Sequence, residues 1–397
     1  MADELRPFKV DIAKAEVDRL IKKLEETRIP TEDIVPGAGE DYGVSSEWIK
    51  SMYDYWLSGY NWFDHQDRMN QWPHFLTHIN DQTVHFVLAK SKAANALPIL
   101  LIHGWPGSFY EFSQVINPLT EPGDDSKQPF HCVVPSLPGF CFSSPPPRGQ
   151  TLKHVAGMFH TLMLRLGYDQ YYVQAGDWGH WVARELGANS DYATHVQAIH
   201  FNWVPAPLPP LDSPSLSARD KKVHARVQSW LTSHLAYAIL MRNRPSSLSL
   251  MLTDNPTAQL AFIGEKFTEM VNPDNPLVKS KLWKDHTLTT VCLYYFSNCA
   301  STSSLVYFEN TRHEKFPEEV VKKENRVRVP MGYTSFLWDT RPSVRWGVEK
   351  TGNLVFYNER DEAGHFAALE CPEGLVEDVR ALVGMVTRGE VKREEVD

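Results

Sequence analysis

The residues with the clearest capacity for chemistry lie in YYVQAGDWGHWVAREL, residues 171–186. A β-rich run leads into a turn of small residues around Asp177, and an apolar pattern with helical spacing follows. Small residues two before and two after Asp177 allow the backbone to turn steeply and present that side chain. A carboxylate is already anionic at neutral pH and can attack a saturated carbon directly. The turn therefore indicates a covalent alkyl ester, and the alternative is that Asp177 only caps the helix starting at Trp178.

Two residues further along the chain can complete a hydrolytic site. Asp339 lies in SFLWDT, after a segment of β character. His365 lies in DEAGHFAALE, between the last expected strand and the closing helix expected over residues 372–387. In the α/β-hydrolase fold the nucleophile, the acid and the histidine follow one another in this order, each on a loop after a core strand. We therefore expect His365 as the base and Asp339 as its acid. Glu359, Asp361 and Glu362 are alternative acids, disfavoured because they do not arrive from a separate strand.

A second turn can supply hydrogen-bond donors to an oxyanion. HGWPG, residues 103–107, follows the apolar run 98–102, which is typical of a strand buried on both faces of a parallel sheet. Ligands bind at the carboxyl ends of such strands. We expect the amides of Trp105 and of Trp178, the residue after the nucleophile, to form an oxyanion hole. Taken alone, HGWPG is equally consistent with a simple turn from strand to loop.

The elements that must position these residues alternate between strands and helices, which predicts a mainly parallel sheet. Residues 1–30 are expected to form an amphipathic helix, and an aromatic-rich meander follows. After a proline-rich boundary the chain is helical to about residue 323, as expected of a cap that covers the turn at Asp177 and excludes water. The expected divisions are 1–92 (N-terminal helix, meander and first hairpin), 93–204 (first part of the core), 205–324 (cap) and 325–397 (second part of the core).

Four tyrosines of the expected cap are candidate acids: Tyr237, Tyr294, Tyr295 and Tyr307. When a carboxylate opens a strained ring, the departing oxygen stays attached and needs a proton or a strong hydrogen-bond donor. Tyrosine is a neutral donor at pH 7. A tyrosine pair reaching toward a carboxylate would indicate epoxide opening, although cap tyrosines can also simply pack. Chemistry alone does not choose among the four.

Composition excludes several classes of function. The chain has 397 residues, 42% of them hydrophobic, and a net charge of -9, as expected of a soluble globular protein without an electrostatic footprint for nucleic acid. The N-terminus is too charged for a signal peptide or membrane anchor. The charge-free run 286–308 is interrupted by Ser, Thr and Asn, so we expect a buried helical segment. Five cysteines without a CxxC pair argue against a disulfide framework or zinc site and favour a cytoplasmic setting.

Several motifs together carry a family resemblance: HGWPGS, PSLPGF, GDWG, LAYA followed by RPS, AFIGEKF and AGHFAALE. With the N-terminal meander, they closely resemble the microsomal-type epoxide hydrolases, particularly soluble fungal members, nearly from end to end. The resemblance implies that Asp177 is the nucleophile, His365 the water-activating base and Asp339 its orienting acid. It also implies Tyr237 and Tyr307 as ring-opening donors, Tyr307 because it precedes Phe308-Glu309. The implied partners are an epoxide and water, with no metal or organic cofactor; a homodimer stays open.

Two other functions remain as alternatives. Trp178 is similar to the tryptophan that follows the nucleophile in haloalkane dehalogenases and helps to hold halide, although dehalogenases need no tyrosine pair. The other alternative is a hydrolase-fold receptor that binds a small molecule without turnover. A pure receptor has no need of Asp177, Asp339 and His365 together, so the intact set argues against it. The preferred epoxide and its stereochemistry depend on pocket shape, which the sequence does not give.

Overall fold

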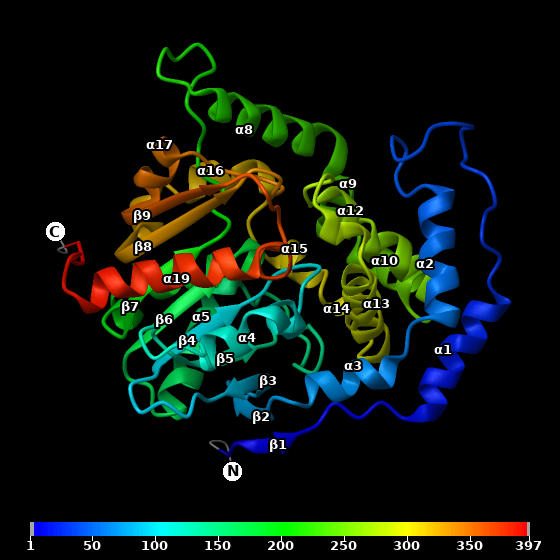
Figure 1. The fold of residues 1–397 in the computed structure, drawn as a ribbon, viewed down its shortest axis with the longest axis horizontal. Coiled ribbons are helices and arrows are strands. Elements are labelled where there is room, and N and C mark those ends of the chain that lie inside the picture. The colour runs from blue at the N-terminus through cyan, green and yellow to red at the C-terminus, as the bar shows by residue number, and fades with distance from the viewer. Residues whose placement is uncertain (1–3, 395–397) are drawn as a thin grey trace.

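The protein, described at residues 4–394 by a computed structural model, is built around one nine-stranded sheet (Figure 1). The strand order is β1-β2-β3-β5-β4-β6-β7-β8-β9. The pairs β1–β2, β2–β3 and β3–β5 are antiparallel, and the other five pairs are parallel. The expected α/β-hydrolase fold with a mainly parallel sheet is therefore confirmed. The strands are β1 Arg6–Phe8, β2 His74–Ile79, β3 Gln82–Ala89, β4 Leu97–Ile102, β5 Phe130–Pro135, β6 Tyr171–Ala175, β7 Val196–Phe201, β8 Val327–Phe336 and β9 Gly352–Arg360.

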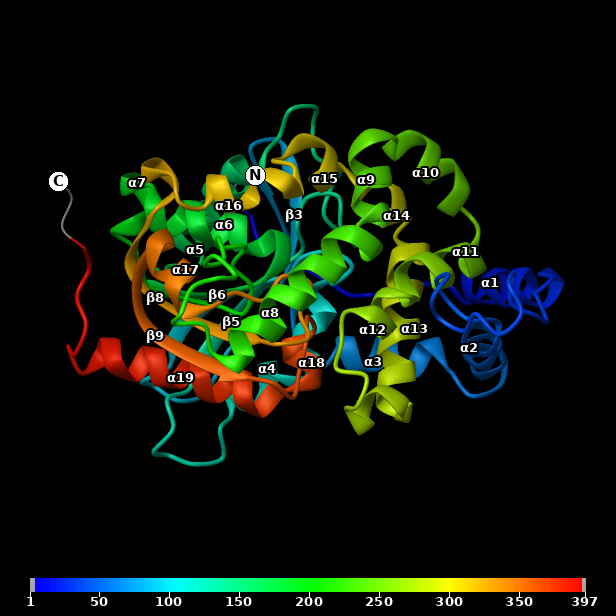
Figure 2. The ribbon, with the colours of Figure 1, turned by 90° about the horizontal axis from the view of Figure 1, so that it is seen from above.

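Helices cover both faces of this sheet (Figure 2). α4 and α19 lie on one face, and α5 and α6 lie on the other. The central strands are therefore shielded from water on both sides, which is why β4 ends in a run of apolar residues that are at most 1% exposed. The core helices are α4 Ile116–Thr120, α5 Leu152–Arg165, α6 Asp177–Ala188, α7 Ser190–Ala193, α17 Arg345–Val348, α18 Ala367–Glu370 and α19 Pro372–Thr387.

Between β7 and β8 the described chain is entirely helical where it is regular. The charge-free run 286–308 falls on three of these helices, α13 to α15, and most of its side chains are buried. No helix within residues 4–394 combines the length and apolar character needed to cross a membrane. The cap helices are α8 Ala218–Ser229, α9 Ala236–Asn243, α10 Pro245–Leu252, α11 Pro256–Gln259, α12 Lys266–Glu269, α13 Lys281–Phe296, α14 Cys299–Thr302, α15 Leu305–Glu309 and α16 Phe316–Glu319.

The N-terminal segment is not the single helix expected over residues 1–30. Residues 1–3 lie outside the described chain, and β1 pairs with β2 at the sheet edge before α1 begins. Edge pairing tolerates Pro7, which has no amide hydrogen to donate. α1 and α2 then lie on the side of the cap away from the sheet (Figure 1), so the cap is held between the sheet and this segment. The helices are α1 Lys14–Glu26, α2 Ser46–Ser58 and α3 Trp62–Met69.

Candidate active site

The turn between β6 and α6 presents Asp177 at the carboxyl end of the sheet. Asp177 is the first residue of α6 and has a φ of +45°, a left-handed conformation rarely adopted outside glycine. The helix approaches β4 so closely that a Cβ at Gly179 would lie 2.4 Å from the carbonyl oxygen of Ile102. The N-cap residue is Gly176, and no side chain caps the helix. Asp177 is thus displayed by a strained turn and does not serve as the helix cap.

The two expected amides both reach the Asp177 carboxylate. The Trp105 amide donates to Asp177 Oδ1 over 2.8 Å, and the Trp178 amide also hydrogen-bonds to this side chain. Burial raises the pKa of Asp177, whereas the charge of His365 and the two amides oppose that rise. The amides consequently stabilise negative charge on an oxygen of Asp177.

His365 lies between the other two members of the expected triad. Its Nδ1 is 2.7 Å from Asp339 Oδ1, and its Nε2 is 3.8 Å from Asp177 Oδ2. The amide of Thr340 donates to the same Asp339 oxygen, which fixes the carboxylate toward the imidazole. Burial opposes protonation of His365, but the adjacent Asp339 charge, its hydrogen bond and the charge of Asp177 raise the pKa of His365 to about 9. The structure therefore brings Asp177, His365 and Asp339 together.

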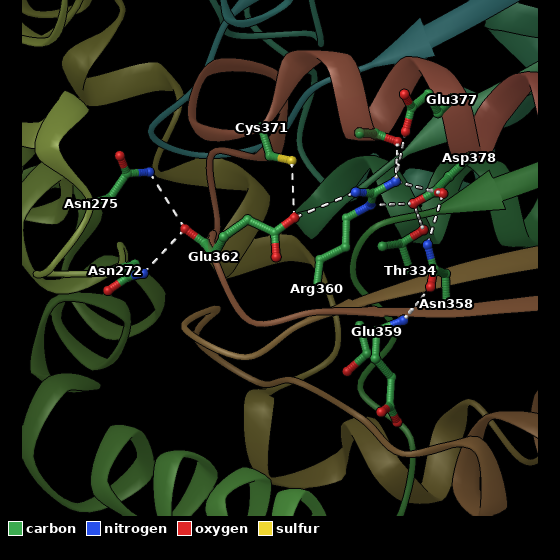
Figure 3. Close-up of polar contacts among 12 residues, drawn as sticks. Asn272, Asn275, Thr334, Asn358, Glu359, Arg360, Glu362, Cys371, Glu377 and Asp378 are labelled. Carbon is green, nitrogen blue, oxygen red and sulfur yellow. Dashed lines mark hydrogen bonds and ion pairs between the residues drawn. The ribbon is translucent and has the colours of Figure 1, made fainter.

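The alternative acids have other partners. Glu359 and Asp361 form ion pairs with Arg219. Glu362 contacts Arg360 and the Cys371 thiol, as Figure 3 shows. Arg360 also binds Asp378 of α19 through two hydrogen bonds of 2.8 and 3.0 Å, as Figure 3 shows. These carboxylates help to anchor the loop, and within residues 4–394 each of the three pairs with an arginine and not with the His365 imidazole.

Glu370 holds the His365 loop and was not anticipated as a site residue. Its carboxylate accepts the amide hydrogens of Gly364 and Phe366 over 3.0 and 3.2 Å. The amide of His365 donates to the carbonyl oxygen of Met270 in the cap over 2.8 Å. Glu370 ends the AGHFAALE motif. A carboxylate this close in sequence to an irregular loop can accept hydrogen bonds from the backbone amides of that loop, and its position is the signal that could have indicated this role. The backbone on both sides of His365 is therefore fixed.

Two of the four candidate tyrosines meet above Asp177. Tyr237 of α9 stacks on the Trp105 ring with centroids 5.0 Å apart, and Tyr307 of α15 packs edge-on against Trp178 at 4.8 Å. The two tyrosine rings are 5.9 Å apart. Burial, with a contribution from the nearby Asp177 charge, raises the pKa of both tyrosines well above the ordinary value. Both phenols are therefore neutral donors beside the carboxylate.

The hydroxyls of the other two tyrosines are already hydrogen-bonded. The Tyr294 hydroxyl donates to the carbonyl oxygen of Gly107 over 2.8 Å. The Tyr295 hydroxyl donates to Asp254 and accepts from Arg19 of α1, at the side of the cap away from the sheet. The structure thus packs Tyr237 and Tyr307 against Trp105 and Trp178, whereas the hydroxyls of Tyr294 and Tyr295 are already bound.

Glu111 is a further buried carboxyl near the triad. It follows HGWPG in the sequence, and a Cβ at Gly107 would lie 2.0 Å from its Oε2. Burial raises the pKa of Glu111 to about 8, opposed by the charge of His365 and reinforced by that of Asp177. Glu111 is therefore mainly protonated at neutral pH. Nothing in its sequence context had singled it out.

Two cavities are lined in part by aromatic residues of the site. One of about 950 Å³ separates the cap from residues 40–43, and its lining includes Tyr237, Phe262 and Lys266. Another of about 230 Å³ is lined by Trp178 and Trp181. Across residues 4–394, no three His, Cys, Asp or Glu side chains are grouped so that they could hold a metal ion.

Comparison with known proteins adds an independent line of evidence. Residues 5–112 match the family model described as "Epoxide hydrolase N terminus", and residues 98–234 match "alpha/beta hydrolase fold". The juvenile hormone epoxide hydrolase of Bombyx mori is 31% identical, covering 96% of this chain and 86% of that protein. The solved structure of Aspergillus niger epoxide hydrolase is 35% identical, with a TM-score of 0.84, covering 96% of this chain and 97% of that one. Epoxide hydrolase 1 of Sus scrofa is 28% identical over 97% of this chain and 89% of its own length.

Proposed function

This chain belongs to the epoxide hydrolase family, and we propose that it converts epoxides to vicinal diols through a covalent ester on Asp177. One observation carries the mechanism. An amide-bound carboxylate, Asp177, faces an imidazole already paired with Asp339, and two neutral phenols lie beside the same carboxylate. Nucleophile, base and acid are thereby present on separate groups.

In the first step, Asp177 Oδ2 attacks an epoxide carbon and the ring C–O bond breaks. The bonding electrons pass to the epoxide oxygen, which accepts hydrogen bonds from Tyr237 and Tyr307 and takes a proton from one of them. Oδ1 stays bound to the Trp105 amide, which favours attack by the other oxygen. The product of this step is a hydroxyalkyl ester and one tyrosinate, which is reprotonated from solvent.

In the second step, water attacks the ester carbonyl carbon and His365 Nε2 accepts the proton of that water. Asp339 stabilises the resulting imidazolium, as an orienting carboxylate does in a catalytic triad. The amides of Trp105 and Trp178 hold the oxyanion on Oδ1. Collapse of the tetrahedral intermediate breaks the bond between the carbonyl carbon and Oδ2, and His365 returns its proton to that oxygen, which leaves with the diol. The Asp177 carboxylic acid that remains releases its proton to solvent, which offsets the proton that the tyrosinate takes up. The mechanism needs no metal or organic cofactor.

Esterification also prepares the base for this step. The Asp177 charge is one of the causes that raise the pKa of His365 to about 9. Forming the ester removes that charge and lowers the pKa of His365. The imidazole then loses its proton more readily and is free to accept one from water. The first step thus promotes the second.

A single-turnover reaction in ¹⁸O-labelled water tests the covalent mechanism. With enzyme in excess over styrene oxide, we expect an unlabelled diol, because both of its oxygens come from the epoxide and from Asp177. With substrate in excess, label should enter the diol after the first turnover. Label in the single-turnover diol would mean direct attack by water.

Trp178 supplies an observation for the dehalogenase alternative. Its indole Nε1 is buried and has no hydrogen-bond partner of normal geometry among residues 4–394, as a halide site would require. The tyrosine pair favours a substrate whose leaving atom is oxygen. Styrene oxide and 1-chlorobutane assayed side by side separate the alternatives: we expect diol and no chloride. Chloride release would support a dehalogenase, and turnover of neither substrate would support a receptor.

We also propose a cytoplasmic location and a homodimer. The five cysteines are all free, which supports a reducing compartment. Exposed apolar residues of the meander, Ile34 at 85% and Tyr42 at 66%, support contact with a second copy. Light scattering tests the dimer, which predicts twice the chain mass of 45.3 kDa.

A further inference from the structure

A buried lysine lies behind Tyr237. Lys266 begins α12, and its side chain is only 3% exposed. Its ammonium pairs with Glu265 and with Glu269, the latter over 3.1 Å. The second Glu269 oxygen is 3.3 Å from Nδ1 of His234. A lysine is almost never this buried without paired carboxylates, and here they are present.

The ammonium of Lys266 also lies over the ring of Tyr237. Nζ is 4.7 Å from the ring centroid, and the same ring stacks on Trp105 with an interplanar angle of 16°. Attraction between a cation and an aromatic ring is strongest where water is excluded. The two contacts together restrict rotation of the Tyr237 ring and hence fix where its hydroxyl points.

The same arrangement matters for charge during ring opening. Negative charge develops on the epoxide oxygen and on the phenol that donates to it. A cation held near that phenol among buried side chains stabilises this charge more than it would in water. Glu265 and Glu269 pair with the ammonium before reaction, so the cation is tolerated in the unreacted enzyme.

We propose that Lys266 is a positioning residue for Tyr237, orienting its phenol and stabilising the charge that the phenol takes on during ring opening. This inference rests on the proposed function, because it requires Tyr237 to act as a donor. Lys266 acts through Tyr237, not on the substrate. Ring opening should depend on Lys266, and hydrolysis of the ester should not.

Rapid-quench single turnovers with styrene oxide measure the two steps separately. In Lys266→Met we expect ring opening to slow roughly tenfold. Ester hydrolysis should stay within about twofold of the wild type. In a Tyr237→Phe background, Lys266→Met should add little, because the residue through which it acts is already disabled.

Further variants keep the test decisive if Lys266→Met folds poorly with two unpaired glutamates. Lys266→Met combined with Glu269→Gln removes one positive and one negative charge, and it should show the same selective slowing. Lys266→Arg keeps the cation and should recover most of the ring-opening rate. Lys284→Met is the matched control, since that ammonium lies 5.6 Å from the Tyr55 ring, outside the site, and both steps should be unchanged.

Each contrary outcome has a distinct meaning. Equal slowing of both steps in folded Lys266 variants, or full additivity with Tyr237→Phe, would reduce Lys266 to a structural residue and overturn the inference. A wild-type rate of ring opening in the Lys266 variants would also overturn the inference. The proposed function would still stand in that case if Tyr237→Phe slowed ring opening. Unchanged ring opening in Tyr237→Phe would instead contradict the proposed role of the tyrosine.

Discussion

The core and the cap hold their reactive side chains by different forces. In the core, Asp177 and His365 are fixed by hydrogen bonds of 2.8 and 2.7 Å. In the cap, Tyr237 and Tyr307 are held mainly through their rings, and the Tyr307 hydroxyl has no partner of normal geometry in the described part of the chain. Buried charges need fixed polar partners, whereas donors must keep a hydroxyl available for the substrate. Damage to the core should therefore stop the reaction, and damage to the cap should slow one step.

The largest expected effect follows from Asp177→Ala. This change deletes the nucleophile without removing core packing, so turnover should disappear while the thermal unfolding transition persists. Asp169→Ala, an exposed position before β6, is the matched control and should retain full activity. Residual turnover above a few per cent in the folded Asp177 variant would show that water attacks the epoxide directly.

The tyrosine pair should produce the next largest effect. Tyr237→Phe and Tyr307→Phe each remove one donor to the departing oxygen, and loss of general acid catalysis typically costs ~10²- to 10⁴-fold in rate. Ring opening should slow by that range in each and nearly vanish in the double variant. Tyr295→Phe serves as the control, because its hydroxyl is bound to Asp254. Normal ring opening in the double variant would remove the cap from the chemistry.

A smaller effect concerns the pH dependence of His365. Its pKa is raised to about 9 in the free enzyme, partly by the Asp177 charge, and the ester lacks that charge. Hydrolysis of the ester should therefore rise with pH and level off with a midpoint below 9, measured by chasing the preformed ester at each pH. A midpoint at 9 or above would mean that the Asp177 charge does not influence the base.

Proton linkage gives the sign of the accompanying effect on stability. The pKa of His365 is raised above its ordinary value of 6.5. Its protonated form therefore contributes stability that is fully present below about pH 6.5 and is lost as the pH rises through about 9. Asp177→Ala weakens this contribution, so the loss of stability across that window should be smaller in the variant.

The smallest effect is expected where the two regions join. Arg226 of α8 donates to the carbonyl oxygens of Asp339, Trp338 and Glu269 over 3.0, 2.8 and 2.6 Å. Arg226→Met should lower the free energy of unfolding by about 2 kcal/mol, because hydrogen bonds to a charged group are lost. Urea denaturation measures this, and turnover of the folded fraction should fall only a few-fold. Arg345→Met, at a 56% exposed side chain, should change neither quantity.

The core was largely predictable from the sequence because its signals are local. The expected closing helix over residues 372–387 is α19, with the same bounds. The turn at Asp177, the strands and the loops that follow them depend on short sequence patterns. Asp177, Asp339 and His365 could therefore be predicted from their places after successive strands.

The cap and the N-terminal segment were less predictable because their structure depends on long-range packing. Choosing Tyr237 and Tyr307 from four tyrosines required either the family resemblance or the packing of α9 and α15 onto Trp105 and Trp178. The strand β1 was missed because its pairing partner lies 70 residues away in sequence, as the Arg6–Leu76 register shows. Lys266 carries no local sign that it contacts a tyrosine 29 positions earlier.

His365→Gln separates the two steps of the reaction, because only His365 should allow water to hydrolyse the ester on Asp177. A carboxylate needs no base to attack, so this variant should still react once and then stall. Intact-mass spectrometry after mixing with excess styrene oxide should find the mass of one substrate added per chain, on the peptide containing Asp177. Sustained formation of diol over many turnovers by this variant would contradict the requirement for His365 in hydrolysis of the ester.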